Sequence, residues 1–318
     1  MRKSKARPGD GRNGERSLIA AGEVFHDLIF YDLQRLPAMG EELKTDTFTV
    51  SVGGGAAITG AAAAGLGRKC RLLTVWGDSP LDVEARTRLL QLGLEVDLSA
   101  LRRRERAGLT VAVSTREDRY FLTCPGANRF VEARLLESDA FAAAQAGDHV
   151  HLALAPKRWQ PFQQLVNRLK ERSVTSSWDL GWDPEAASQP AFAQLRRALD
   201  VLFLNEMEAL RYTGAEDAET ALDALCKQGD TVVVKLGSKG AIAGRGEQRA
   251  ESAPLSVEAM ETTGAGDAFN GGFLHRWMEG DSLEDCLRAG NICGGLSTRR
   301  PGGLDGLPTA REFASKFD

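Results

Sequence analysis

The N-terminal part of the chain contains short apolar runs, which indicate buried strands, and longer segments with helical spacing. The apolar runs are residues 18–24 and 70–76. A Gly-rich turn at residues 53–55 leads into an Ala-rich segment at 56–67, and residues 81–92 place apolar side chains on one helical face. The pattern therefore predicts two strands, each followed by a helix.

Four short segments follow a different pattern, in which apolar and polar residues alternate. They are residues 46–52, 96–98, 109–113 and 120–123. Alternation with a period of two is typical of strands, and polar turns separate these segments. We therefore predict a small sheet that is separate from the main body.

From residue 128 onward, candidate helices and strands alternate along the chain. Helical spacing is found in residues 131–145, 161–171, 192–199, 206–213 and 217–228. Runs that predict strands are residues 149–154, 174–178, 201–204 and 231–236. Such alternation predicts a parallel sheet with helices on both faces.

Composition and charge narrow the class of protein. The chain has 318 residues, and a hydrophobic fraction of 42% is enough for a substantial core. A net charge of −4 and a pI of about 5.8 argue against a whole-protein attraction to nucleic acid or to an anionic membrane. No segment approaches the about 18 apolar residues that a membrane helix needs. We therefore expect no nucleic-acid partner and no membrane partner.

Two features bear on the cellular compartment. Residues 1–16 are polar and basic and lack the apolar segment of a secretory signal, so we expect a disordered extension. An Arg-rich mitochondrial address is the alternative, although the segment fits an amphipathic helix poorly. The five cysteines are odd in number and form no C-x-x-C pair, which is typical of reduced thiols. We expect a cytoplasmic protein.

Two histidines are spaced so that both lie on one face of a predicted strand. His149 and His151 could share a metal ion in this arrangement. No third ligand is near them in the sequence, so we interpret them as two imidazoles at a strand end whose hydrogen bonds are all satisfied.

Residues 261–273 carry the strongest chemical signal. The glycines in this string allow a sharp turn and a close backbone approach to a ligand, and the apolar residues that follow have helical spacing. Free N–H groups at a helix N-terminus suit a phosphate, so Gly264, Ala265 and Gly266 are the expected anion hole. Asp267 lies in the first turn, where a carboxylate is suited to accept a proton from an attacking hydroxyl.

This string resembles D-T-x-G-A-G-D followed by A-F-x-G-G, the second signature of the ribokinase-like (PfkB) carbohydrate kinase family. Residues 53–67 resemble the first signature of that family, and the order of elements is similar from Leu18 to the C-terminus. The resemblance implies an α/β fold, a ribokinase-like three-layer sandwich with a mainly parallel central sheet and a small β-sheet lid. It also implies transfer of the ATP γ-phosphate to a primary alcohol, often the hydroxymethyl group of a sugar.

The same resemblance divides the chain into a body and a lid. Residues 17–30, 52–95 and 126–318 would form the α/β domain that binds nucleotide and substrate, and residues 31–51 and 96–125 would form the lid. The active site would lie between the two. Lid edges often pair between subunits in this family, so a homodimer through the lid is expected by analogy.

Residues on the nucleotide side are assigned through the resemblance. Asn205 and Glu208 match the N-x-x-E motif of the magnesium and phosphate network, so ATP and Mg²⁺ are implied, with Glu208 binding the metal through water. The strand end and loop beside the nucleotide start at Lys235, and Asn291 matches an asparagine near the adenine. The complete implied nucleotide set is Asn205, Glu208, Lys235, Gly237, Ser238, Gly240 and Asn291.

The acceptor side is assigned in the same way, for a small sugar-like molecule. Asp27 matches an aspartate that binds sugar hydroxyls. Gly53 and Gly54 belong to the first signature, and Asn128 resembles the return from the lid to the body.

Two positions depart from the family pattern. Ile58 stands where an asparagine commonly contacts sugar hydroxyls, and an aliphatic side chain forms no hydrogen bond, so ribose is expected to be a poor acceptor. Glu261 stands where an aspartate lies by a monovalent-cation site. Glu261 is therefore a candidate K⁺ site, and the extra methylene leaves potassium activation open.

Two alternative functions remain. The acceptor could be a nucleoside or a vitamin alcohol, or the chain could be a non-catalytic regulator that binds a sugar or a nucleotide. Asp267 and its flanking glycines are intact, which favours an enzyme.

Overall fold

The computed structural model describes residues 16–98, 100–115, 119–181, 189–226 and 230–317. Most of the extension expected at residues 1–16 therefore lies outside the described residues. Arg16 is described, and its guanidinium donates a hydrogen bond to the carbonyl of Met278 at 3.0 Å.

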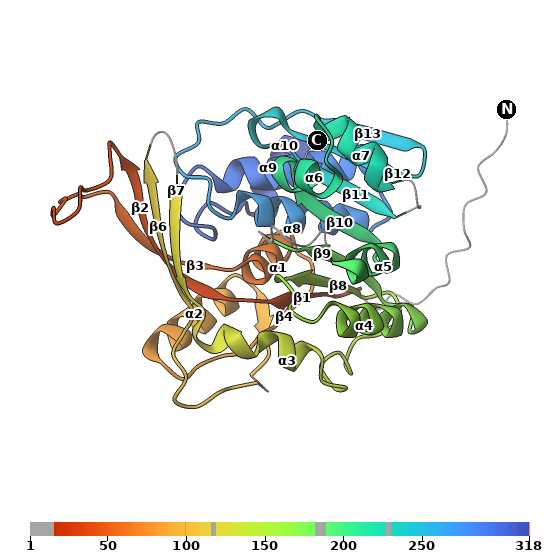
Figure 1. Ribbon diagram of the computed structural model, residues 1–318, viewed down its shortest axis with the longest axis horizontal. Coiled ribbons are helices and arrows are strands. Elements are labelled where there is room, and N and C mark those ends of the chain that lie inside the picture. Colours follow the sequence, from red (N-terminus) through yellow and green to blue (C-terminus); the bar gives the residue numbers. More distant parts are fainter. Residues whose placement is uncertain (1–15, 99, 116–118, 182–188, 227–229, 318) are drawn as a thin grey trace.

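The body of the described structure is built on a nine-stranded sheet with the order β13-β12-β11-β10-β9-β8-β1-β4-β5 (Figure 1). Its strands are β1 (Leu18–Gly22), β4 (Cys70–Leu73), β5 (Leu94–Val96), β8 (His149–Ala153), β9 (Thr175–Asp179), β10 (Val201–Asn205), β11 (Thr231–Lys235), β12 (Ala241–Arg245) and β13 (Gln248–Ser252). Neighbouring strands from β11 to β5 are parallel, and β12 and β13 are antiparallel additions at one edge. The mainly parallel sheet predicted from the sequence is confirmed.

Ten described helices lie on the two faces of this sheet. They are α1 (Gly55–Gly65), α2 (Pro80–Gln91), α3 (Val131–Leu135), α4 (Trp159–Glu171), α5 (Pro190–Ala198), α6 (Glu206–Thr213), α7 (Ala218–Cys226), α8 (Ala265–Trp277), α9 (Leu283–Ser297) and α10 (Ala310–Phe317). Helices α3 to α7 share one apolar core with the sheet, and α1, α2, α8 and α9 share the core on the opposite face. This is the expected three-layer arrangement. None of the described helices is long and apolar enough to span a membrane.

A second, four-stranded sheet stands beside the body, at the left of Figure 1, in the order β3-β2-β6-β7. Its strands are β2 (Phe25–Leu33), β3 (Phe48–Gly53), β6 (Leu109–Thr115) and β7 (Arg119–Cys124). Strand β2 begins before the insertion expected at residues 31–51, and β3 continues past its end. The predicted small sheet therefore exists, and it follows the body strand β1 almost directly.

One expected helix is much shorter than the pattern indicated. Residues 131–145 read as one helix, but α3 ends at Leu135. The buried Arg134 forms ion pairs with Glu137 and Asp139 in the segment that follows, both at 3.0 Å. Residues 136–143 form turns, so the helix propensity of this Ala-rich segment does not decide its structure.

Helices α1 and α8 pack closely and run from neighbouring N-termini. A Cβ atom at Gly271 of α8 would lie 2.6 Å from the Cβ of Ala62 in α1, so a side chain there would force the helices apart. Thr59 of α1 donates a hydrogen bond from its hydroxyl to the carbonyl of Asp267 at 3.0 Å. The two signature segments found in the sequence are therefore in direct contact.

Candidate active site

The loop before α8 has the backbone geometry that the sequence predicted. Gly264 precedes the helix with φ 77°, in the left-handed region that favours glycine. A Cβ there would also lie 2.7 Å from Cδ1 of Ile58. The N–H groups of Gly264 and Gly266 donate to no acceptor among the described residues, whereas that of Ala265 donates to the carbonyl of Thr262 at 3.2 Å. Two of the three expected anion-hole donors are thus free.

Asp267 lies in the first turn of α8, with its carboxylate turned toward the start of α1. A Cβ at Gly55 would lie 3.0 Å from its Oδ1 atom, so the first residue of α1 leaves room for the carboxylate. Burial raises the pKa of Asp267 to about 7, the negative charge of Asp179 adds to this, and Lys235 opposes it. A carboxylate with a pKa near neutrality is well matched to general-base catalysis.

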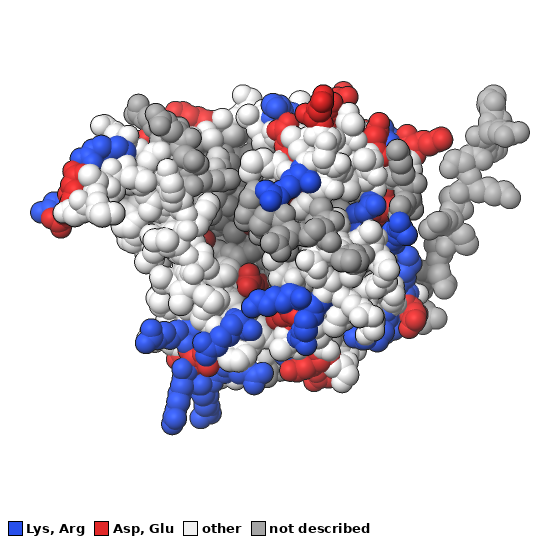
Figure 2. All heavy atoms as spheres, in the orientation of Figure 1, with Lys and Arg blue, Asp and Glu red and all other residues white. Residues whose placement is uncertain are grey.

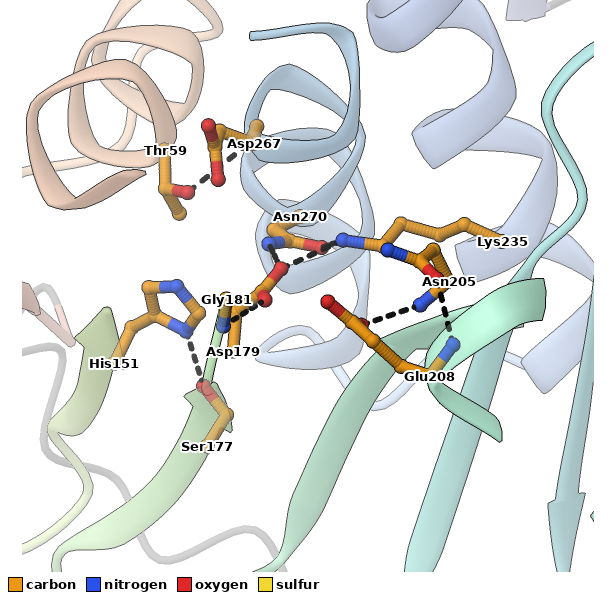
Figure 3. A network of polar contacts seen from close by, with 10 residues as sticks. All are labelled: Thr59, His151, Ser177, Asp179, Gly181, Asn205, Glu208, Lys235, Asp267 and Asn270. Atoms are coloured by element: carbon orange, nitrogen blue, oxygen red, sulfur yellow. Dashed lines mark hydrogen bonds and ion pairs between the residues drawn. The ribbon is translucent and has the colours of Figure 1, made fainter. Parts of the chain in front are cut away.

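A compact polar cluster lies beside Asp267 (Figure 3). Lys235, at the end of β11, forms an ion pair with Asp179, at the end of β9, with Nζ and Oδ2 2.6 Å apart. Asn270 of α8 donates from Nδ2 to the same oxygen at 2.7 Å and accepts from Lys235 at 3.3 Å. Burial alone would raise the pKa of Asp179, but Lys235 and Asn270 outweigh it and hold that pKa below its ordinary value.

Sequence reasoning missed two members of this cluster. Asp179 directly follows the strand predicted at residues 174–178 and is the last residue of β9, and the carboxyl ends of neighbouring parallel strands meet at one edge of a sheet, where ligands bind. Asn270 lies one helical turn after Asp267. The position after a predicted strand could have indicated Asp179, and the helical spacing from Asp267 could have indicated Asn270.

Asn205 and Glu208 cap α6 reciprocally. The side chain of Asn205 accepts from the N–H of Glu208, and Oε2 of Glu208 accepts from the N–H of Asn205, both at 2.8 Å. Figure 3 shows the Glu208 side chain turned toward the cluster of Asp179 and Lys235. Burial, and then the charge of Asp179, raise the pKa of Glu208 to about 7. The pair therefore has a local capping role, and Oε1 is left over for a ligand.

The remaining residues assigned to the nucleotide side differ in solvent exposure and in hydrogen bonding. Gly237 and Ser238 are exposed on the loop after β11, and Gly240 is buried at its end. Both hydrogens of the Asn291 amide are used, because Nδ2 donates to the carbonyls of Ser252 at 2.9 Å and of the next residue at 3.0 Å. Asn291 thus fixes the end of β13 against α9.

The acceptor-side residues meet where the small sheet joins the body. Asp27 of β2 lies directly opposite Ser51 of β3, and a Cβ at Gly53 would overlap the Asp27 carboxylate. Burial, and then the charge of Glu261, raise the pKa of Asp27 to about 7. Its carboxylate accepts no hydrogen bond from the described residues, so it is available to a ligand.

Two other acceptor-side positions have structural contacts. The side-chain amide of Asn128 is engaged with the backbone of Val24, accepting from its N–H at 3.1 Å and donating to its carbonyl at 2.7 Å. Gly54 precedes α1 as its N-terminal cap residue. Both therefore hold the junction between the small sheet and the body.

The two histidines of β8 are buried in a hydrogen-bonded chain. His149 bonds to the hydroxyls of Thr175 and Ser177. The Ser177 hydroxyl also bonds to Nδ1 of His151 at 2.8 Å, as Figure 3 shows. Nε2 of His151 has no partner among the described residues. The interpretation of two fully bonded imidazoles is therefore wrong for His151. No group of three metal-ligating side chains occurs in the described part of the chain.

Comparison with known proteins agrees with this geometry. A family profile described as pfkB family carbohydrate kinase matches residues 15–310. The chain is 30% identical to an ATP-dependent ribose-1-phosphate kinase of Halopiger xanaduensis over 94% of this chain and 97% of that protein. The structure of Arabidopsis thaliana ribokinase with ribose and ATP is similar over 96% of this chain and 99% of that chain, with a TM-score of 0.79 and 25% identity.

A fructokinase from Vibrio cholerae O395, whose structure holds fructose, ADP and a potassium ion, has the same fold. Its TM-score is 0.76 at 21% identity, and the match covers 96% of this chain and 99% of that chain. The fold, the two signatures in contact and the family match agree, and the chain belongs to the pfkB family of carbohydrate kinases, which are ATP-dependent enzymes.

Proposed function

We propose that this kinase transfers the γ-phosphoryl group of ATP to a hydroxymethyl group of a sugar or sugar derivative, with Asp267 as general base. The observation that carries the proposal is the position of Asp267, half-buried between the N-termini of α1 and α8, together with its pKa of about 7. The hydroxyl loses its proton to the Asp267 carboxylate as its oxygen bonds to phosphorus. The bond from phosphorus to the leaving oxygen breaks and ADP is released.

Charge that develops on the transferring group would be stabilised by this chain's own donors. The free N–H groups of Gly264 and Gly266 lie at the helix N-terminus beside Asp267, where they suit a phosphoryl oxygen. Lys235 remains paired with Asp179 and adds a fixed positive charge at the same end of the sheet. Asp27 would hold acceptor hydroxyls, since a carboxylate accepts hydrogen bonds from two such groups.

Magnesium is implied by the family, and the residues present fit it. Glu208 offers Oε1, which has no bond to the described residues, in a partly desolvated site that also contains Asp179. Hard oxygen ligands suit Mg²⁺, which usually keeps several waters. When bound, the ion would neutralise charge on the β- and γ-phosphates.

An acceptor screen tests the proposed function. ADP release should be measured with sugars, sugar phosphates, sugar acids and nucleosides as acceptors, with Asp267→Asn as the matched inactive variant. The proposed function predicts turnover with at least one sugar-type acceptor, and poor turnover with ribose because Ile58 is buried against Gly264 and forms no hydrogen bond. Turnover with nucleosides alone would contradict the sugar assignment.

We also propose a homodimer through the small sheet. The face opposite Asp27, here called the outer face, carries Leu28, Val50, Val111 and Leu122 in register across the four strands. Leu122 is 73% exposed and Val50 46%. A contiguous apolar surface of this kind marks an interaction site, and a second copy of the same sheet matches its chemistry.

Sedimentation velocity tests the dimer. Leu122→Glu places a charge in the proposed interface and should convert the dimer to a monomer. Leu90→Glu is the control: Leu90 is 58% exposed on α2, outside the proposed interface, so this variant should remain a dimer. A wild-type monomer at micromolar concentration would contradict the proposal.

The cytoplasm is the proposed compartment. All five cysteines are free, and four of them are buried among apolar residues, which supports a chain that folds under reducing conditions.

A further inference from the structure

The segment that leads into the anion hole is bound to a second loop far away in the sequence. The carbonyl of Thr298 accepts hydrogen bonds from the N–H groups of Met260 at 2.8 Å and Glu261 at 3.2 Å. Gly302 donates its N–H to Oε2 of Glu261 at 3.3 Å. These bonds join residues 260–263, which immediately precede α8, to residues 298–302, which follow α9.

Glu261 is the centre of this connection. Its Oε1 atom accepts from the N–H of Thr263 at 2.6 Å and from the Thr263 hydroxyl at 2.5 Å, and Oε2 accepts from Gly302. The side chain is buried, with 6% exposed. Both carboxylate oxygens are therefore held by donors of this chain, and none of those donors is a cation.

This donor set suits an anion and not a monovalent cation. A potassium ion is held by oxygen lone pairs that replace its hydration shell. Here the carboxylate of Glu261, the candidate cation ligand, already accepts three bonds from N–H and O–H groups, and the neighbouring Thr298 carbonyl accepts two more. Each of those hydrogens carries positive partial charge and is directed at the oxygens that the ion would need.

We propose that Glu261 substitutes for a monovalent cation, so that its hydrogen bonds to Thr263 and Gly302 order the anion-hole loop and the enzyme needs no potassium. The effect on turnover rests on the proposed anion hole, but the effect on the folded loop does not.

The path from Glu261 to the anion hole is short. Gly303 follows Gly302, and its Cα atom would lie 2.9 Å from a Cβ built at Gly264. The backbone that Glu261 holds therefore packs directly against the first residue of the anion hole. Loss of the bond to Gly302 would let this contact move.

The length of the Glu261 side chain allows it to reach both Thr263 and Gly302. Aspartate is one methylene shorter, and the bond from Gly302 to Oε2 is already long at 3.3 Å. An aspartate that kept the bonds to Thr263 would leave the Gly302 N–H without its partner. Glutamate thus connects two loops that an aspartate would leave unconnected.

Cation replacement tests the inference on the wild-type enzyme. The protein is prepared in tetramethylammonium chloride, and thermal midpoint and ADP release are measured after replacement with KCl or NaCl at matched ionic strength. We expect turnover to agree within about twofold and the midpoint of the nucleotide-free protein to be the same in all three salts. A tenfold activation by KCl, or a midpoint raised by KCl and not by the other salts, would overturn the inference.

Three variants sharpen the test. Glu261→Asp should lose at least about tenfold in turnover in tetramethylammonium chloride and should recover in part with KCl, since a carboxylate freed from Gly302 can bind the ion. Glu261→Gln should lose turnover without recovery, because it keeps the length but removes the charge. Glu258→Asp makes the same change at an exposed position of the same segment and should behave as wild type in every salt.

These variants also have outcomes that count against the inference. If Glu261→Asp matches the wild type in all salts, the bond to Gly302 orders nothing, and the inference is wrong. If no acceptor in the screen supports turnover, the proposed function fails, but the thermal midpoints of the wild type and of Glu261→Asp still decide whether the loop binds a cation.

Discussion

The catalytic side and the acceptor side of the site are built in opposite ways. On the catalytic side, Asp179, Lys235 and Asn270 satisfy one another within 2.6 to 3.3 Å, so the charges beside Asp267 are fixed before any ligand arrives. On the acceptor side, the Asp27 carboxylate is buried yet accepts no bond from the described residues. The proposed chemistry would therefore use charges that the protein fixes in advance, whereas the proposed acceptor would supply the hydrogen bonds that Asp27 lacks.

The strongest way to break the catalytic side is Asp267→Asn. The amide is nearly isosteric and keeps the helix start, but it cannot accept the proton. We expect kcat to fall by at least about 10²-fold, with ATP affinity changed much less. Steady-state kinetics and calorimetric titration of ATP check this, and a near-normal kcat with the true acceptor would remove Asp267 as the base.

Asp27→Ala should break only the acceptor side. Loss of two hydrogen bonds to a charged group should raise the acceptor KM by about 10- to 100-fold. The ATP KM should stay nearly constant, because the nucleotide-side residues are on other strands. Both KM values are measured from initial rates with each substrate varied in turn. Equal effects on the two KM values would show that Asp27 does not belong to the acceptor site.

The pH dependence of kcat should report the catalytic side. Burial raises the pKa of Asp267 to about 7, and the base acts only when deprotonated, so kcat should fall as the pH drops below about 7, approaching tenfold per unit. Asp267→Asn should have no such acid limb. A wild-type kcat that stays constant down to pH 5 would show that no group with this pKa acts as the base.

The smallest expected effect concerns magnesium. Glu208→Gln keeps the cap of α6 in shape but removes a charge, so the magnesium concentration for half-maximal activity should rise by about 3- to 10-fold. Glu206→Gln is the matched control, because Glu206 lies on the same helix as Glu208 but forms an exposed ion pair with Lys239 of the loop after β11, and the variant should leave the curve unchanged. Superimposable curves for Glu208→Gln and the wild type would count against its role.

The two sides also differ in how far the sequence predicts them. The loop at Gly264 is a local feature, since the left-handed conformation before the helix favours glycine, and a preference of this kind can be recognised in the sequence. The cluster around Asp179 is not local: its partner Lys235 is 56 positions away and Asn270 is 91 positions away. The parallel order of β9, β10 and β11 brings Asp179 and Lys235 to the same edge of the sheet, and α8 places Asn270 beside them. The sequence pattern does not show which strands are neighbours or how they align.

The sequence prediction was wrong at two places. The helix expected at residues 131–145 ends at Leu135, and Arg134 pairs with a carboxylate of the segment that follows. The bonding of His151 depends on Ser177 of the neighbouring strand, and its Nε2 has no partner among the described residues. Propensity and motif predict elements and loops, whereas side-chain partners are settled by tertiary packing.

The direct passage from β3 through Gly53 and Gly54 into α1 has a mechanical consequence. The small sheet is joined to the body at this point, and the same helix holds Asp267 through Thr59. A rotation of the sheet about this pivot would sweep its far end through a wide arc, while Asp27, which lies next to the pivot at Gly53, would hardly move. Such a rotation would therefore change the position of the far end of the sheet while the distance between the carboxylates of Asp27 and Asp267 stayed nearly constant.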